Sequence, residues 1–179
     1  AMKFVMNVRK ELGFRTIFNL LGPLSNPGFV KKQMVGVYSK SLLLPFAESL
    51  KKLGSTNAWI VCGHDGLDEV STTGPTFCAE LKNNKIRQFQ IRPEDLNFKK
   101  AKLRDLIGGD AQKNAKEILD LLNGKKGAFN DIVRFNASAT LLATNNATNL
   151  KNAKEKVDES IDNKFALKKL HQLIKVSNI

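Results

Sequence analysis

Two adjacent acidic residues, Asp68 and Glu69, are the first candidates for chemistry in this chain of 179 residues. They lie in a glycine-containing loop, GHDGLDE, which directly follows the apolar run AWIVC. Two carboxylates supply hard oxygen ligands and leave the other positions around Mg²⁺ to water and substrate phosphates, as this ion prefers. The pair is therefore a candidate magnesium site for a phosphorylated substrate, although adjacent acidic residues are also common in solvated turns.

A basic cluster near the start of the chain, formed by Arg9, Lys10 and Arg15, is the second candidate. The planar guanidinium of arginine suits bidentate capture of a carboxylate or a phosphate. Recognition of an aromatic acid requires an arginine beside an apolar wall, and Gly22 and Pro23 could form that wall. On the residues alone, a solvated surface helix and a helix stop at Gly22-Pro23 remain open as alternatives.

Other polar features are interpreted as structural. His64 beside the acidic pair is a lone histidine, which is more often structural than catalytic. The segment Gly108-Gly109-Asp110 resembles a phosphate cradle, but Asp110 suits a helix N-cap and would repel a phosphate. Cys62 and Cys78 are predicted to be buried reduced thiols, since no metal-ligand or redox spacing surrounds them.

The composition is that of a soluble globular protein, with 42% apolar and 26% charged residues. Lysine and arginine number 29 against 17 acidic residues, and this net charge of +12 indicates a polyanionic partner, either phosphorylated metabolites or nucleic acid. No apolar run reaches the roughly 18 residues of a membrane span, and the first residues carry no secretory signal. We therefore expect a cytoplasmic protein without a membrane partner.

An α/β fold is predicted to position these candidates. A strand at 33–38, a helix at 41–53 and a strand at 58–62 form a βαβ pattern, whose ligands bind beyond the carboxyl ends of the strands. Further strands at 69–81 and 85–91, joined by a hairpin at Asn83-Asn84, make the sheet mixed but largely parallel. Helices are expected at 16–21, where Gly22-Pro23 would stop the helix, and at 110–122, 129–144, 149–161 and 165–176.

Several segments, in order, resemble motifs of the anthranilate phosphoribosyltransferase family: LGFRTIFNLLGPLSNP, MVGVYS, GHDGLDEVSTTGPT, GGDAQKNAKEILDLLNG and NASATLLA. The resemblance implies the C-terminal type of α/β domain found in nucleoside phosphorylases and phosphoribosyltransferases. It also implies transfer of the phosphoribosyl group from phosphoribosyl pyrophosphate (PRPP) to anthranilate. This glycosyltransferase reaction is the second step of tryptophan biosynthesis from chorismate.

The resemblance also implies roles for four residues. Arg9 would hold the anthranilate carboxylate, and Pro23 would line the path by which anthranilate reaches the site. Asp68 and Glu69 would bind the Mg²⁺ that carries PRPP, and no general base is implied. Three further residues match the motif without an assigned role: Arg15, Thr16 and Asn19.

The family also carries upstream parts that this chain lacks: a helical domain that makes the dimer and a glycine-rich GTGGD segment that cradles pyrophosphate. We therefore expect residues 1–179 to be a single-domain C-terminal portion of the α/β domain, inactive alone. The complete protein is expected to be a homodimer, with a glutamine amidotransferase component of anthranilate synthase as a possible partner.

Two other functions remain as alternatives. A non-catalytic protein on the same scaffold would use the basic surface to bind nucleic acid, but aromatic residues make up only 7% of the chain. A nucleoside phosphorylase of the same fold would use phosphate and a nucleoside, and the Asp68-Glu69 pair with Arg9 argues against it.

Overall fold

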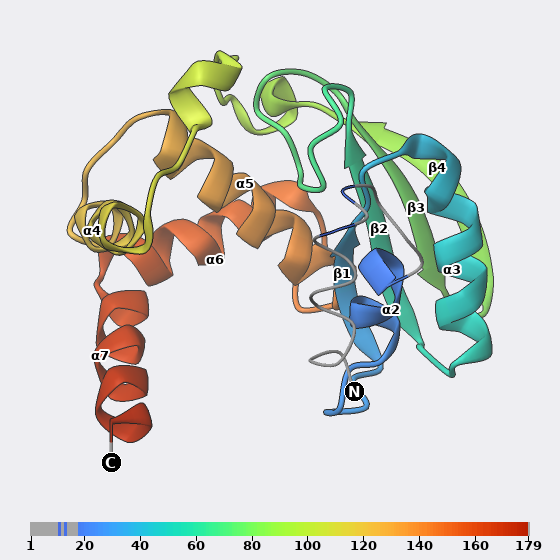
Figure 1. Ribbon diagram of the computed structural model, residues 1–179. Helices are drawn as coiled ribbons and strands as arrows, with labels where there is room; N and C mark the ends of the chain where they lie inside the picture. Colours follow the sequence, from blue (N-terminus) through green and yellow to red (C-terminus); the bar gives the residue numbers. More distant parts are fainter. Residues whose placement is uncertain (1–10, 12, 14–17, 179) are drawn as a thin grey trace.

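The computed structural model describes residues 11, 13 and 18–178, whose elements are labelled in Figure 1. The strands are β1 (Lys32–Gly36), β2 (Asn57–Gly63), β3 (Thr76–Lys82) and β4 (Lys85–Ile91). The α-helices are α2 (Phe18–Leu24), α3 (Leu43–Lys52), α4 (Ala111–Leu122), α5 (Ala128–Ala143), α6 (Leu150–Asp162) and α7 (Phe165–Ser177). Short 3-10 helices lie at η2 (Lys40–Leu42), η3 (Pro93–Leu96) and η4 (Leu103–Leu106).

The strands form one sheet in the order β1-β2-β3-β4. β1 and β2 are parallel and are joined through α3, which is the predicted βαβ unit. The pairs β2-β3 and β3-β4 are antiparallel. The predicted mixed sheet with flanking helices is confirmed, but one of the three pairs among the described strands is parallel, fewer than we expected.

The two connections of β3 explain why fewer strand pairs are parallel than we expected. Asn83 and Asn84 have φ values of 50° and 63°, the left-handed backbone that a two-residue hairpin requires, so the predicted hairpin is confirmed. The expectation that a strand begins at Glu69 is wrong, because β3 begins at Thr76. Residues 69–75 instead belong to the loop that turns the chain back after β2, and hydrogen bonds from side chains replace strand pairing there.

Helices cover both faces of the sheet, with α3 on one face and α5 on the other (Figure 1). Successive residues of a strand point to opposite faces. Ile60 therefore joins the core under α3, whereas Trp59 and Val61 join the core under α5, around Phe135. The prediction that the helix at 129–144 is buried between layers is confirmed.

Helix α2 differs from the prediction at its end. The sequence predicted that Gly22 and Pro23 stop the helix, but α2 continues to Leu24 with Pro23 inside it. A proline within a helix removes the hydrogen bond to the residue four positions back and crowds the carbonyl of that residue, so another interaction must offset this cost. Leu20 and Leu24 are partly buried against the core under α3, so packing favours the extra turn.

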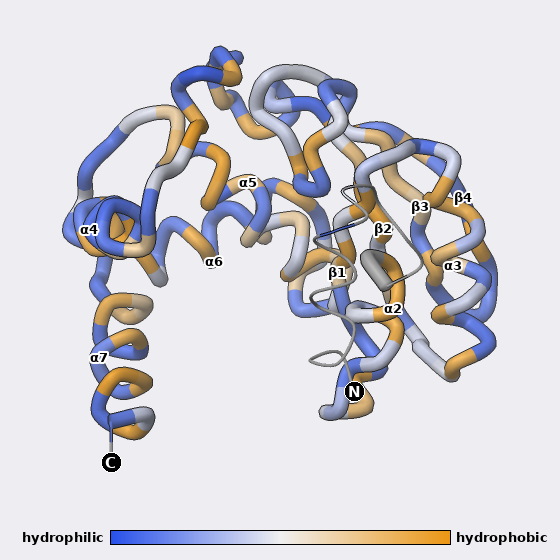
Figure 2. The backbone as a smooth tube through the Cα atoms, viewed as in Figure 1, coloured by the Kyte–Doolittle hydropathy of each residue, from blue (hydrophilic) through white to orange (hydrophobic). Residues whose placement is uncertain are grey.

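The second half of the chain is helical, as predicted, and α4, α6 and α7 form an arm beside the sheet (Figure 1). In Figure 2 α7 shows hydrophobic and hydrophilic residues alternating along its length. Several of its apolar side chains are exposed, including Phe165, Leu173 and Val176. No helix in the part of the chain that the structure describes has the length and apolarity of a membrane span.

Candidate metal and substrate site

The Asp68-Glu69 pair lies in the loop that connects β2 to β3, beyond the carboxyl ends of the parallel strands β1 and β2. Both residues are exposed. Gly36, the last residue of β1, lets this loop approach the sheet closely. A Cβ atom added at Gly36 would lie 1.6 Å from the carbonyl oxygen of Asp68, so no other residue fits there without moving the loop. The predicted position at a strand end is confirmed.

Asp65 holds the first half of the loop in a tight turn. Its carboxylate accepts hydrogen bonds from the hydroxyls of Thr73 (2.5 Å) and Ser71 (3.0 Å) and from the N–H of Leu67 (3.1 Å). Burial would raise the pKa of the Asp65 carboxyl, but these hydrogen bonds outweigh it, so the pKa lies below its ordinary value. Asp65 is therefore ionised and stabilises the loop through these hydrogen bonds, rather than serving as a ligand for a metal ion.

The second half of the loop is tied to the sheet and to α5. The N–H of Ser71 donates to the hydroxyl of Thr76 at 2.9 Å, and the N–H of His64 donates to the Pro75 carbonyl at 3.0 Å. Val70 is fully buried in the core under α5, directly after the acidic pair. His64 serves the loop through its backbone, while its exposed ring lies close to Gly74.

The two candidate ligands raise the negative potential at this end of the sheet. Glu69 is exposed at the surface, but the loop around it removes part of the water from its carboxyl; this desolvation, and then the charge of Asp68, raise the pKa of Glu69 above its ordinary value. Burial, together with the charges of Asp65 and Asp68, also raises the pKa of the Cys62 thiol at the end of β2. A bound cation would offset this repulsion.

The donor set fits a magnesium ion. Among the described residues, neither Asp68 nor Glu69 forms an ion pair, and no group of three or more histidine, cysteine or acidic side chains gathers as a closed metal cage. Two exposed carboxylates without further protein ligands leave room for water and phosphate oxygens, which suits Mg²⁺ better than Zn²⁺.

Of the other predicted substrate residues, the structure describes Pro23, and it lies away from this pair. Arg9, Lys10, Arg15 and Thr16 lie outside the described residues, as does the side chain of Asn19. Pro23 lines a cavity of about 260 Å³ together with Leu24, Phe29 and Leu53. This cavity lies at the start of β1 and the end of α3, whereas the acidic pair lies beyond the end of β1. Neither Asp68 nor Glu69 lines that cavity, so the three predicted site residues that the structure describes do not share one pocket.

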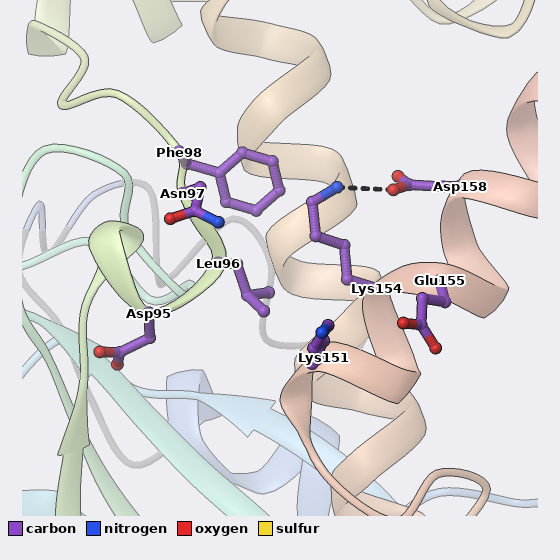
Figure 3. A pocket seen from close by; sticks show the side chains of 8 residues that line it. All are labelled: Asp95, Leu96, Asn97, Phe98, Lys151, Lys154, Glu155 and Asp158. Atoms are coloured by element: carbon purple, nitrogen blue, oxygen red, sulfur yellow. Dashed lines mark hydrogen bonds and ion pairs between the residues drawn. The ribbon is translucent and has the colours of Figure 1, made fainter.

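A larger cavity of about 370 Å³ lies between η3 and α6, apart from the acidic pair (Figure 3). One pair of its charged side chains is satisfied: the Lys154 ammonium donates to Asp158 at 2.5 Å and lies 5.5 Å from the centre of the Phe98 ring. The charges are mixed, with Asp95, Lys151 and Glu155 at the rim. Acidic and basic side chains are mixed around this cavity, so it does not present the single sign of charge that favours a phosphate or a metal ion.

The segment Gly108-Gly109-Asp110 before α4 forms hydrogen bonds to α4 itself. The Asp110 carboxylate accepts a hydrogen bond from the N–H of Lys113 at 2.8 Å, which makes it the N-cap. The N–H of Gly109 donates to the side-chain oxygen of Asn114 at 2.8 Å. The structural interpretation of this segment is confirmed, and so is that of Cys62 and Cys78, which are buried and free.

Two residues that serve the site were missed by sequence reasoning. Gly36 stands within an apolar, β-branched strand, where a glycine signals close backbone approach. Asn136 lies in α5 between the buried apolar residues Phe135 and Ala139, and its side chain binds the backbone of Val70. A polar residue on a buried helical face was the available signal for the second of these.

This fold and site identify the class of protein. Residues 1–167 match the family described as "Glycosyl transferase family, a/b domain", and the chain belongs to that family. It is similar to anthranilate phosphoribosyltransferase of Parvibaculum lavamentivorans, with 47% identity over 99% of this chain and 52% of the relative.

Solved structures give the same result. Anthranilate phosphoribosyltransferase from Saccharomyces cerevisiae in complex with 4-fluoroanthranilate superposes with a TM-score of 0.90 at 31% identity, over 99% of this chain and 52% of that one. The same yeast protein in complex with PRPP and Mg also has a TM-score of 0.90, with 31% identity and the same coverage. The chain thus spans about half the length of the relatives it matches.

Proposed function

We propose that the complete protein carrying this chain transfers the phosphoribosyl group of PRPP to the amino group of anthranilate and releases pyrophosphate. The observation that carries this proposal is the exposed Asp68-Glu69 pair, which has no ion-pair partner among the described residues although the loop around it is densely hydrogen-bonded. The relatives' names, and the substrates bound in the yeast structures, support the same reaction.

In this proposal the two carboxylates hold Mg²⁺, which would neutralise the charge that develops on the departing pyrophosphate. The nitrogen of anthranilate forms a bond to C1 of the ribose as the bond from C1 to the pyrophosphate oxygen breaks. Arg9 orients anthranilate through its carboxylate, and Pro23 lines its path. Positioning of the two substrates can supply much of the rate enhancement, so no strong base is required.

The test is the loss of anthranilate fluorescence on addition of PRPP and Mg²⁺, measured in parallel for this chain and for the complete protein. We expect activity only in the complete protein, because the chain spans about half of its relatives. Arg9→Ala in the complete protein should raise the KM for anthranilate more than that for PRPP. Absence of activity in both samples, together with strongly salt-dependent binding of nucleic acid, would overturn the proposal.

Two further expectations of the complete protein stay predictions. They are a homodimer and association with an amidotransferase component of anthranilate synthase. Sedimentation of the complete protein with and without that component tests both.

A further inference from the structure

Asn136 in α5 makes a long-range contact with the loop that carries the acidic pair. Its side-chain oxygen accepts a hydrogen bond from the N–H of Val70 at 2.9 Å, and its amide nitrogen donates to the carbonyl of Val70 at 2.8 Å. The same nitrogen also donates to the carbonyl of Ile132 at 3.0 Å. Both amide hydrogens of the side chain are therefore in use, and it holds one loop residue by both of its backbone groups.

This contact acts on Glu69, because Val70 directly follows it in the chain. The N–H of Val70 belongs to the same planar peptide unit as the Cα of Glu69, so fixing that N–H fixes the plane from which the Glu69 side chain departs. The Val70 side chain is fully buried among residues that include Phe135 and Ala139, on either side of Asn136 in sequence. Helix α5 thus holds the loop directly after Glu69 by packing and by two hydrogen bonds.

The sheet supports the loop at the preceding residue. The carbonyl of Asp68 occupies the space that a side chain at Gly36 would fill. The acidic pair is therefore confined between β1 on the Asp68 side and α5 on the Glu69 side. Neither support uses the carboxylates themselves, which stay exposed.

We propose that Asn136 is a positioning residue for metal binding: by fixing the Glu69-Val70 peptide it holds the Asp68 and Glu69 carboxylates where one divalent cation can bind both. The inference rests on the proposed magnesium role of that pair. Groups that support metal ligands typically change metal affinity about 10–100-fold when they are removed, because a misoriented ligand binds poorly.

The test compares Asn136→Ala with Ser138→Ala in the complete protein. Ser138 is a matched control, since it is a buried polar residue of the same helix whose hydroxyl donates only to the Arg134 carbonyl, at 2.7 Å. Binding of Mn²⁺ is measured by electron paramagnetic resonance of the free ion, and loop order by hydrogen exchange of a peptide that contains Val70. The Mg²⁺ concentration for half-maximal rate is a third measurement.

We expect Asn136→Ala to weaken Mn²⁺ binding about tenfold, to raise the required Mg²⁺ by a similar factor and to accelerate exchange in the loop, with kcat at saturating Mg²⁺ within about twofold. Ser138→Ala should change none of these. Asn136→Ser can keep the bond to Ile132 but cannot reach Val70, so it should behave like Asn136→Ala even if the alanine variant is unstable.

Two results overturn the inference, and they are distinguishable. If the unaltered protein binds Mn²⁺ and both Asn136 variants bind it equally well, Asn136 has only a structural role while the proposed function stands. If the unaltered protein neither binds Mn²⁺ nor responds to Mg²⁺, the proposed function fails, and the inference fails with it.

Discussion

Helix α5 carries two polar side chains, two residues apart, that serve opposite kinds of region. Arg134 is 4% exposed and forms ion pairs with Asp158 at 2.5 Å and Asp162 at 2.6 Å of α6. It also donates a hydrogen bond to Asn130 of its own helix at 2.8 Å. Asn136 faces the β2-β3 loop, where it binds backbone and leaves the neighbouring carboxylates exposed. The charges around Arg134 are paired with one another, whereas the carboxylates of the β2-β3 loop remain exposed.

The difference teaches how to separate structural from functional charge in this protein. Burial alone would lower the pKa of Arg134, but hydrogen bonds from its guanidinium to Asp162 and Asp158 outweigh it and raise the pKa. Glu69 receives no such compensation, and burial with the charge of Asp68 raises its pKa. Acidic residues whose pKa is raised and whose carboxylates remain unpaired are candidates for binding a cation.

The largest expected effect comes from removing the carboxylates that Arg134 needs. Asp158→Asn with Asp162→Asn leaves a buried guanidinium without a counter-charge, which should cost about 3–5 kcal/mol in the free energy of unfolding. Arg134→Met should cost roughly half of that or less, because the carboxylates left behind are 30% and 51% exposed and water can solvate them. Urea denaturation measures both. Equal losses would show that packing, not charge, dominates this region.

Removing the charges of the β2-β3 loop should lower activity without lowering stability. Asp68→Asn with Glu69→Gln should lower kcat/KM for PRPP about 100-fold, equivalent to about 2.7 kcal/mol, because metal-assisted charge neutralisation is lost. The urea concentration at the midpoint of unfolding should not fall, since the substitution relieves the repulsion between the two carboxylates. Glu48→Gln, at an exposed position of α3, is the control. Loss of stability with unchanged kinetics would reverse the assignment of the two regions.

Cys78 shows what burial does without a compensating partner. Burial, with the charge of Glu80 as a smaller cause, raises the pKa of Cys78 from 9.0 to about 12. The folded state then keeps a proton that the unfolded state releases, so stability is complete below pH 9 and falls as the pH rises toward 12. The slope should reach about 1.4 kcal/mol per pH unit. Cys78→Ala should flatten this part of the curve, and an unchanged slope would contradict the assignment.

The smallest effect is expected in the cavity between η3 and α6. Lys154→Met removes a half-buried ion pair with Asp158, and such pairs contribute up to about 1 kcal/mol. Transferase activity should stay within about twofold, because this cavity lies apart from the acidic pair. A loss of more than about tenfold in activity would make the cavity part of the site.

Most of the elements could be predicted because their patterns are local. The βαβ unit, the Asn83-Asn84 hairpin and the helices of the second half follow from hydrophobic period and turn residues. The errors arose where distant parts of the chain compete with local signals. Packing of Leu24 extends α2 past Pro23, and bonds from Asn136 hold residues after Glu69 in a loop although they look like a strand.

The sequence by itself determined the candidate ligands and their place after a strand, because adjacent carboxylates at a strand end are visible in the order of residues. Only the tertiary structure decided which charges are available. Arg134 is paired by residues 24 and 28 positions away, and Asn136 reaches Val70 across 66 positions. Such contacts depend on how α5 packs between the sheet and α6, a relation in space that the local spacing of residues does not encode.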